Sequence, residues 1–235
     1  MKRRTVLLGG AGFALAAGAG MFLSRPKDVG KNHSDYFSGL NTLLKRDGPG
    51  RPVMLLDIDR MDHNIDQIAK SVGSAKTFRI VVKSLPSMPL LQHAMAKAKT
   101  NALMVFHQPF LNAIVEVFPA ADILLGKPMP VSAVETFYKK LKAGSFGAGS
   151  QVQWLVDTPD RLRQYQELAH RLDIKMRINC EIDVGLHRGG LDEPRELDSI
   201  LDVIHADPDH LKFSGLMGYE PHLTGMKADL EHPAV

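Results

Sequence analysis

The feature that most constrains the fold is a repeated alternation of short apolar runs of strand length with longer segments of helical period. The apolar runs are Val53 to Ile58, Arg79 to Val82, Ala102 to Phe106, Asp122 to Leu125, Val152 to Val156, Met176 to Ile182, and Leu211 to Met217. Because each intervening helix returns the chain to the same end of the sheet, the alternation predicts parallel strands. The fold class is therefore α/β, as either a barrel or an open sheet.

The helical segments carry polar residues at their expected starts. They include Met61 to Val72, Pro89 to Lys97, Ser132 to Leu141, Pro159 to Leu172, and Glu193 to His205. The predicted amino-terminal caps are Asp59, Ser87, Ser132, Thr158 and Asp192. No Gly-x-Gly-x-x-Gly follows the first predicted strand, and the phosphate-binding pattern Gly-x-x-x-x-Gly-Lys-Ser/Thr does not occur. A barrel is therefore favoured over a nucleotide-binding fold.

The amino terminus reads as a targeting segment. Lys2-Arg3-Arg4 precedes nineteen uncharged residues, Thr5 to Leu23, that are rich in Gly and Ala. This pattern resembles a twin-arginine export signal, although Val6 stands where that signal usually has Phe. An uncleaved anchor is the alternative, because about 20 residues cross a bilayer. Either interpretation predicts a periplasmic body, with membrane anchoring in the second case.

The rest of the chain divides into two regions. Residues 27–50, with several glycines among polar residues, predict a linker with one short helix near Tyr36 to Lys45. Residues 51–235 are expected to form the barrel domain.

Charge and cysteine content narrow the choice of function. The 29 basic and 26 acidic residues give a net charge of +3, and three of the basic residues cluster at positions 2 to 4. The body is thus near neutral, which argues against nucleic acid as a partner. Cys180 is the single cysteine, so an intramolecular disulfide is excluded and a buried residue is expected.

In an α/β barrel the active site lies at the carboxyl ends of the strands. The run Arg79 to Val82 ends in Lys83, just before a loop that contains Pro86. A partly desolvated lysine loses proton affinity, and its free amine then forms an imine with an aldehyde cofactor. A solvated lysine at a strand end is the alternative.

Two further segments place charge after a predicted strand. In the first, Glu181 and Asp183 share one side of the strand and Arg188 is close enough in sequence to pair with them, as an ion-pair cluster or a ligand site. In the second, glycines allow close backbone approach, and Tyr219 and His222 offer proton-transfer groups.

Together, these segments resemble the fold-type III pyridoxal-phosphate enzymes, in particular their branch of D-threonine aldolases and D-serine dehydratases. The resemblance runs from about Arg51 to Leu223. It rests on Arg51 to Asp59 with Asn64, on Lys83, on Glu-x-Asp-x-Gly-x-x-Arg-x-Gly beginning at Glu181, and on Gly218-Tyr219-Glu220-x-His222. It departs after Lys83, where Ser84-Leu85-Pro86 replaces Thr-His-Lys, and at Phe106, where the family has small residues.

The resemblance implies a function as well as a fold. Lys83 would carry pyridoxal 5'-phosphate as a Schiff base, with Arg188 beside the pyridine ring. Tyr219 would contact cofactor or substrate and take part in catalysis, and His222 would bind cofactor or transfer a proton. The expected substrates are small amino acids, in particular D-hydroxy amino acids that undergo aldol cleavage or dehydration, and the full-length enzyme is expected to be a homodimer.

The resemblance also predicts an incomplete fold. The first predicted strand, Val53 to Ile58, would belong to a second, β-rich domain, which leaves six of the eight strands of a pyridoxal-phosphate-binding (β/α) barrel. The remaining strands, the rest of the second domain and any ligands of a divalent metal are expected beyond Val235. No metal ligand is assigned within the chain.

Other functions remain open from the residues alone. A binding protein that carries pyridoxal phosphate without catalysis and an amino-acid racemase share the same motifs. A metal-dependent hydrolase would use His187 and His222, although these lack a tight ligand spacing. A phosphatase would use Asp57 and Asp59, but Met61 replaces the Thr or Val expected there.

Overall fold

The computed structural model describes residues 30–84, 86–142, 144 and 146–225, in two compact units, Met1–Leu55 and Leu56–Val235. The signal or anchor predicted at residues 1–26 lies outside the described residues. In the first unit, helix α2 (Asp35–Asp47) forms where the short helix was predicted. Among the described helices, none is both long and apolar enough to cross a bilayer.

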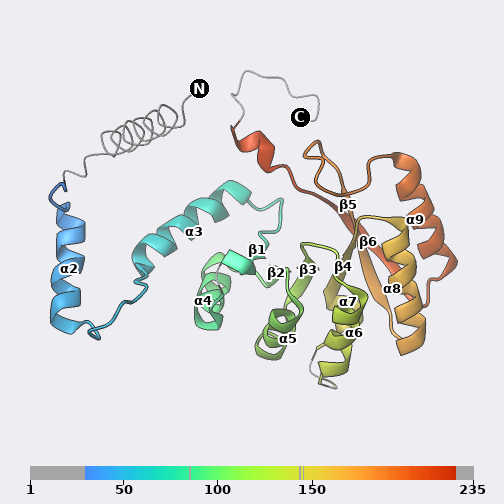
Figure 1. Ribbon diagram of the computed structural model, residues 1–235, viewed down its shortest axis with the longest axis horizontal. Helices are drawn as coiled ribbons and strands as arrows, with labels where there is room; N and C mark the ends of the chain where they lie inside the picture. Colours follow the sequence, from blue (N-terminus) through green and yellow to red (C-terminus); the bar gives the residue numbers. More distant parts are fainter. Residues whose placement is uncertain (1–29, 85, 143, 145, 226–235) are drawn as a thin grey trace, which may run out of the picture. The chain divides into compact units, whose positions relative to one another are not determined.

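The second unit is built on a six-stranded parallel sheet in which each strand pairs with the next one along the chain (Figure 1). The strands are β1 (Ile80–Val81), β2 (Ala102–Val105), β3 (Asp122–Leu125), β4 (Val152–Val156), β5 (Met176–Ile182) and β6 (Leu211–Gly218). In the described residues β1 and β6 do not pair with each other, so the barrel is not closed. The predicted α/β fold, an incomplete barrel of six strands, is confirmed.

Helices connect consecutive strands and cover one side of the sheet (Figure 1). They are α4 (Met88–Ala98), α5 (Gln108–Val117), α6 (Val131–Lys140), α7 (Ala148–Gln151), α8 (Pro159–Leu172) and α9 (Pro194–Ala206), with 3-10 turns at Val82–Ser84 and Pro221–Gly225. Helix α3 (Ile58–Val72) precedes β1 and packs against α4. The apolar side chains between helices and sheet include the fully buried Trp154, Phe137 and Tyr165, whose rings pack edge to face. Cys180 is also buried, as predicted, and burial raises the pKa of its thiol to about 11.

The predicted run from Val53 to Ile58 is not a strand. In the described structure residues 53–57 pair with no strand, and Ile58 already begins α3. A strand is stable only when a neighbouring strand satisfies its backbone groups. Here the side chain of Asp57 instead accepts a hydrogen bond from the amide of Arg60 at 3.0 Å and starts the helix.

Two of the five predicted helix caps, Thr158 and Ser87, occupy the cap position in the structure, and three do not. Thr158 is confirmed, because its hydroxyl accepts a hydrogen bond from the amide of Arg161 at 3.2 Å. Ser87 occupies the cap position of α4 without a side-chain bond. Asp59, Ser132 and Asp192 are wrong, because the helices begin after Asp57, Pro130 and Glu193. A cap must keep an extended backbone, and at these sites that conformation falls one or two residues away from the predicted cap.

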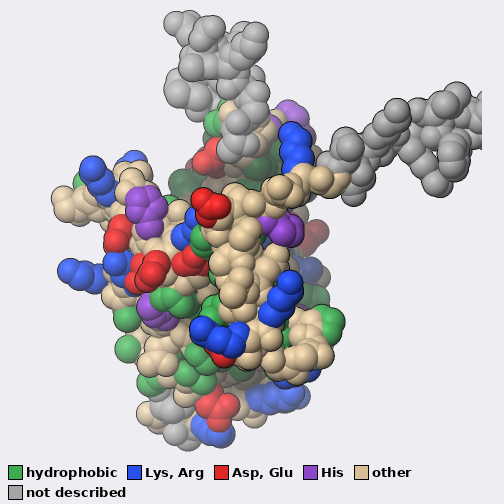
Figure 2. All heavy atoms as spheres, turned by 90° about the vertical axis from the view of Figure 1, so that its left-hand side faces the viewer, with side chains coloured by type: hydrophobic (Ala, Val, Ile, Leu, Met, Phe, Trp, Pro, Cys, Tyr) green, Lys and Arg blue, Asp and Glu red, His purple; other side chains and the backbone are tan. Residues whose placement is uncertain are grey.

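On the face shown in Figure 2, basic and acidic side chains of the described residues are interspersed. Surface ion pairs such as Lys139 with Glu135 (3.0 Å) and Lys97 with Asp66 (2.8 Å) follow this pattern. Solvent screens ion pairs at exposed positions, so these surface charges contribute little to the stability of the fold.

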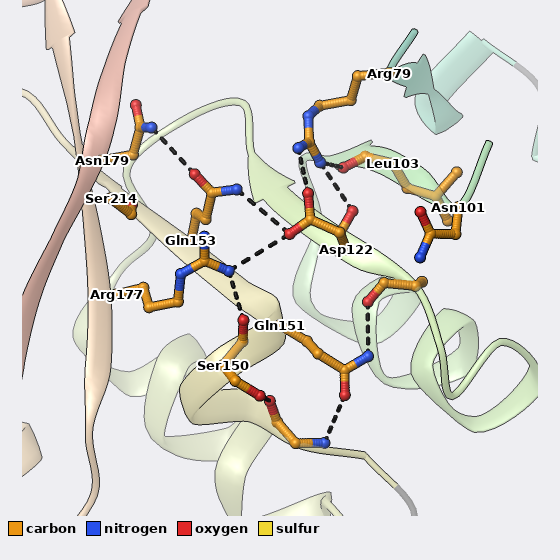
Figure 3. A network of polar contacts seen from close by, with 12 residues as sticks. Arg79, Asn101, Leu103, Asp122, Ser150, Gln151, Gln153, Arg177, Asn179 and Ser214 are labelled. Atoms are coloured by element: carbon orange, nitrogen blue, oxygen red, sulfur yellow. Dashed lines mark hydrogen bonds and ion pairs between the residues drawn. The ribbon is translucent and has the colours of Figure 1, made fainter. Parts of the chain in front are cut away.

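A polar network fills the sheet interior at the amino ends of the strands (Figure 3). Asp122, the first residue of β3, pairs with the Arg79 guanidinium and lies 3.5 Å from Arg177. Gln153 donates to Asp122 at 3.4 Å and accepts from Asn179 at 3.3 Å. Because side chains alternate along a strand, residues 177, 179 and 181 face this interior, whereas Ile178 and Cys180 lie in the apolar core. The side chains of this network do not fill the opposite end of the interior, at the carboxyl ends of the strands.

The network predicts a stability effect. Replacing Asp122 with Ala removes the carboxylate between two half-buried guanidinium groups, and we expect the free energy of unfolding to fall by about 2 kcal/mol. Urea denaturation of the purified chain measures the change. Asp160→Ala is the matched control, because it removes an exposed carboxylate paired with Arg163 and should cost no more than about 0.5 kcal/mol. Equal losses in the two variants would refute a structural role for the network.

Candidate active site

A cavity of about 420 Å³ lies at the carboxyl ends of the strands. The residues that line it come from the ends of β1, β2, β3 and β6 and from the loop after β5. They are Val81, Lys83, Ser84, Met104, Phe106, Gly126, Arg188, Met217, Gly218 and Tyr219. Three of the four predicted site residues, Lys83, Arg188 and Tyr219, thus line one cavity.

Lys83 lies in the 3-10 turn that directly follows β1. Its Nζ is 4.2 Å from the centroid of the Phe106 ring, a distance at which the face of the ring attracts an ammonium group. The side chain is exposed, so the expected desolvation of Lys83 is wrong for the described structure. The sheet does not close on itself, and the cavity wall beside Lys83 is therefore open to solvent.

Arg188 and Tyr219 form the other side of the cavity. Ile182 of β5 pairs with Gly218 of β6, so the segments that follow these two strands lie side by side. The guanidinium carbon of Arg188 is 4.3 Å from the centroid of the Tyr219 ring. The two side chains hold each other beside the cavity through a cation–π contact.

Of the two alternatives left open for Glu181, Asp183 and Arg188, the ion-pair cluster with Arg188 is not found in the described structure. Glu181, only 2% exposed, accepts hydrogen bonds from Lys127 Nζ at 3.2 and 3.3 Å, not from Arg188. Asp183 accepts from the backbone amides of Gly185 and His187 at 2.9 and 3.0 Å. The bond from the His187 amide, opposed by desolvation, holds the pKa of Asp183 below its usual value. These bonds turn the loop, and Arg188 is thereby directed toward Tyr219.

The remaining predicted candidates lie away from the cavity lining. His222 is half-buried in the 3-10 turn Pro221–Gly225, and its predicted role stays a prediction. Asp57 caps α3 and Asp59 lies exposed in its first turn, so the two do not form the phosphatase arrangement at a strand end. His187 lies 2.9 Å from Asp183 and is mostly exposed.

Three residues in or beside the cavity lining were missed by the sequence analysis. Gly126 and Lys127 follow β3 directly, and Phe106 follows β2. A Cβ on Gly126 would lie 2.2 Å from the Phe106 ring, so only glycine lets the ring pack there. The position of all three after a strand was a usable signal, because every carboxyl end of a parallel sheet meets the same edge.

The sequence profile of the family "Alanine racemase, N-terminal domain" matches residues 56–232, and the chain belongs to this family. This agrees with the fold-type III resemblance identified in the sequence. No curated protein sequence matches the chain.

Solved structures resemble the chain in fold. They include a variant of D-threo-3-hydroxyaspartate dehydratase (18% identity, TM-score 0.64, 81% of this chain and 47% of that one). D-threonine aldolase from Filomicrobium marinum has 19% identity and a TM-score of 0.56, over 70% of this chain and 43% of that one. Alanine racemase from Oenococcus oeni has 19% identity and a TM-score of 0.53, over 67% and 43%. The chain spans less than half the length of each of these structures.

The buried ion pair at the site yields a prediction. Lys127→Met leaves the Glu181 carboxylate buried without its cation, and we expect the free energy of unfolding to fall by about 2 kcal/mol. Adding Glu181→Gln removes the buried charge and should restore most of the loss. Urea denaturation of both variants tests this. A double variant no more stable than Lys127→Met would contradict the pairing as the cause.

Proposed function

We propose that this chain forms the cofactor-binding part of a pyridoxal-phosphate-dependent enzyme acting on amino acids, with Lys83 as the residue that bonds the cofactor. The observation that carries the proposal is the convergence of Lys83, Arg188 and Tyr219 on one cavity at the carboxyl ends of the strands. Membership of the alanine racemase N-terminal domain family supports it.

The residues around the cavity suit a planar, anionic, aldehyde-bearing ring. The volume of about 420 Å³ falls within the roughly 300–1,000 Å³ of small-molecule sites. Lys83 offers a primary amine, Arg188 a fixed positive charge, and Phe106 an aromatic surface. Glycine at 126 and 218 allows close packing at the edge of the cavity, since a Cβ would lie 2.2 Å from the Phe106 ring and 2.9 Å from Val184 Cγ1. The donor set and the shape therefore fit pyridoxal phosphate.

Each residue would have a separate task. When bound, pyridoxal phosphate supplies an electron sink for bond cleavage at the substrate Cα. The Lys83 amine would anchor the cofactor and, once displaced by the substrate, could hold a proton. Arg188, held by Tyr219, would orient the ring and disfavour protonation of its nitrogen. The Tyr219 hydroxyl holds or moves a proton on the other side of the cavity.

For the reaction, we favour cleavage or dehydration of D-hydroxy amino acids. The motifs at Lys83, Glu181 to Arg188 and Gly218 to His222 support this branch of the family, and D-threonine aldolase and D-threo-3-hydroxyaspartate dehydratase share the fold. From the basic and apolar amino terminus we further propose that the protein is exported to the periplasm or anchored in the membrane facing it. From the family resemblance we propose that the complete enzyme is a homodimer.

Covalent trapping tests the cofactor proposal. The purified chain is incubated with pyridoxal phosphate, reduced with borohydride, digested and mapped by mass spectrometry. We expect the reduced label on Lys83, and we expect Lys83→Ala to lose both the label and the yellow absorbance. Lys76→Ala, which removes an exposed lysine outside the cavity, should keep both. A main label on another lysine would end the proposal.

Product analysis tests the reaction class separately. The cofactor-loaded protein is given D-threonine, D-serine and L-alanine. Glycine with acetaldehyde, or a 2-oxo acid with ammonia, from the D-hydroxy amino acids is the expected result, and Tyr219→Phe should slow it. Formation of D-alanine alone would identify a racemase and overturn the lyase assignment while leaving the role of Lys83 intact.

A further inference from the structure

A group of side chains of the types that ligate metals lies at the end of the sheet opposite the candidate active site. His170 is in the last turn of α8, Asp207 follows α9, and His210 directly precedes β6. Met176 of β5 pairs with Leu211 of β6, so the segments that precede these strands are adjacent. A backbone hydrogen bond of 2.8 Å from the Met176 amide to the His210 carbonyl holds these two segments together. The group is thus at the amino ends of the strands, away from the cavity of Lys83.

The three side chains converge on one point. His170 Nε2 lies 2.6 Å from Asp207 Oδ2, and His210 Nδ1 lies 2.8 Å from Asp207 Oδ1. The two imidazole rings are stacked, with centroids 4.1 Å apart and planes at 21°. One ligand atom from each residue lies within 4.8 Å of the others. The ligand atoms of tetrahedral zinc are about 3.4 Å apart, so the two His–Asp contacts need to open by less than about 1 Å to admit the ion.

Neighbouring residues hold these ligands in the orientation that metal binding needs. Gln166, one turn before His170 on α8, donates to Asp207 Oδ2 at 2.8 Å. The second nitrogen of His210, Nε2, lies 3.9 Å from Oδ1 of the exposed Asp173. Because a carboxylate only accepts, Nδ1 carries the proton that it donates to Asp207 Oδ1, and a bound metal ion would take the place of this proton. The backbone turn from Asp207 to His210 is closed by amide bonds from His210 and Leu211 to the Asp207 carbonyl.

We propose that His170, Asp207 and His210 form a binding site for a divalent transition metal such as Zn²⁺, separate from the candidate active site. Two imidazoles and one carboxylate suit zinc and exclude calcium and magnesium, which prefer oxygen ligands. Half of the His170 side chain is exposed, so water completes the coordination. The metal would join the end of α8 to the α9–β6 turn and stabilise the amino end of the sheet.

Zinc titration of the chelator-treated, tag-free chain tests the site. We expect saturable binding of Zn²⁺, with an affinity that falls at least about tenfold in His170→Gln, His210→Gln and Asp207→Asn. Zn²⁺ should also raise the melting temperature of the parent chain, and this rise should be lost in the three variants. Circular dichroism establishes that each variant is folded. His170→Gln changes a side chain at an exposed helix end, so this variant keeps the test valid if the others fail to fold.

Two control variants make the result specific. His205→Gln removes an exposed histidine from the last turn of α9, the helix that Asp207 follows. This change should leave the affinity within about twofold of the parent. His187→Gln disrupts the other described cluster, Asp183, His187 and Asp192, and should also leave this site intact. Absence of saturable zinc binding, unchanged affinity in His170→Gln, or a loss caused by His187→Gln instead would each overturn the proposal.

Discussion

Parallel pairing of each strand with its successor is the constraint on which the rest of the structure depends. It places the carboxyl ends of all six strands at one edge of the sheet and the amino ends at the other. Residues far apart in the sequence, such as Lys83, Arg188 and Tyr219, therefore line one cavity without any direct sequence signal of their contact. The same register brings the segments before β5 and β6 together, and with them His170 and His210.

The interior of the sheet is divided along the strand direction. At the amino ends the Asp122 carboxylate lies between Arg79 and Arg177 and offsets part of their positive charge, and the side chains of this network fill that end of the interior. At the carboxyl ends the buried Glu181 pairs with the half-exposed Lys127, which directly follows the cavity residue Gly126. A buried carboxylate is tolerated only when its charge is matched, so the positions of these cations are as important to the fold as the apolar core.

Two aromatic rings position the two cationic side chains of the cavity. Phe106 packs over Gly126, and the Lys83 ammonium group contacts the face of the Phe106 ring. The Arg188 guanidinium contacts the Tyr219 ring in the same way. Both cationic groups are thus positioned by aromatic faces and still reach solvent. This arrangement suits the binding of an anionic ligand, because the ligand would replace water around Lys83 and Arg188 without a prior rearrangement of these side chains.

The sequence by itself determined the strands β1 to β6, most helices, the fold class, and three residues of the candidate site, because apolar period and strand-end position are local properties. Only the tertiary structure decided the partners of the charges. An ion pair of Arg188 with the acidic residues was one of two alternatives, but the turn at Asp183 directs Arg188 to Tyr219, and Lys127, which follows β3, pairs with Glu181. The segment 53–57 shows the same limit, since its apolar residues suit a strand but strand formation requires a pairing partner, which no local pattern can supply.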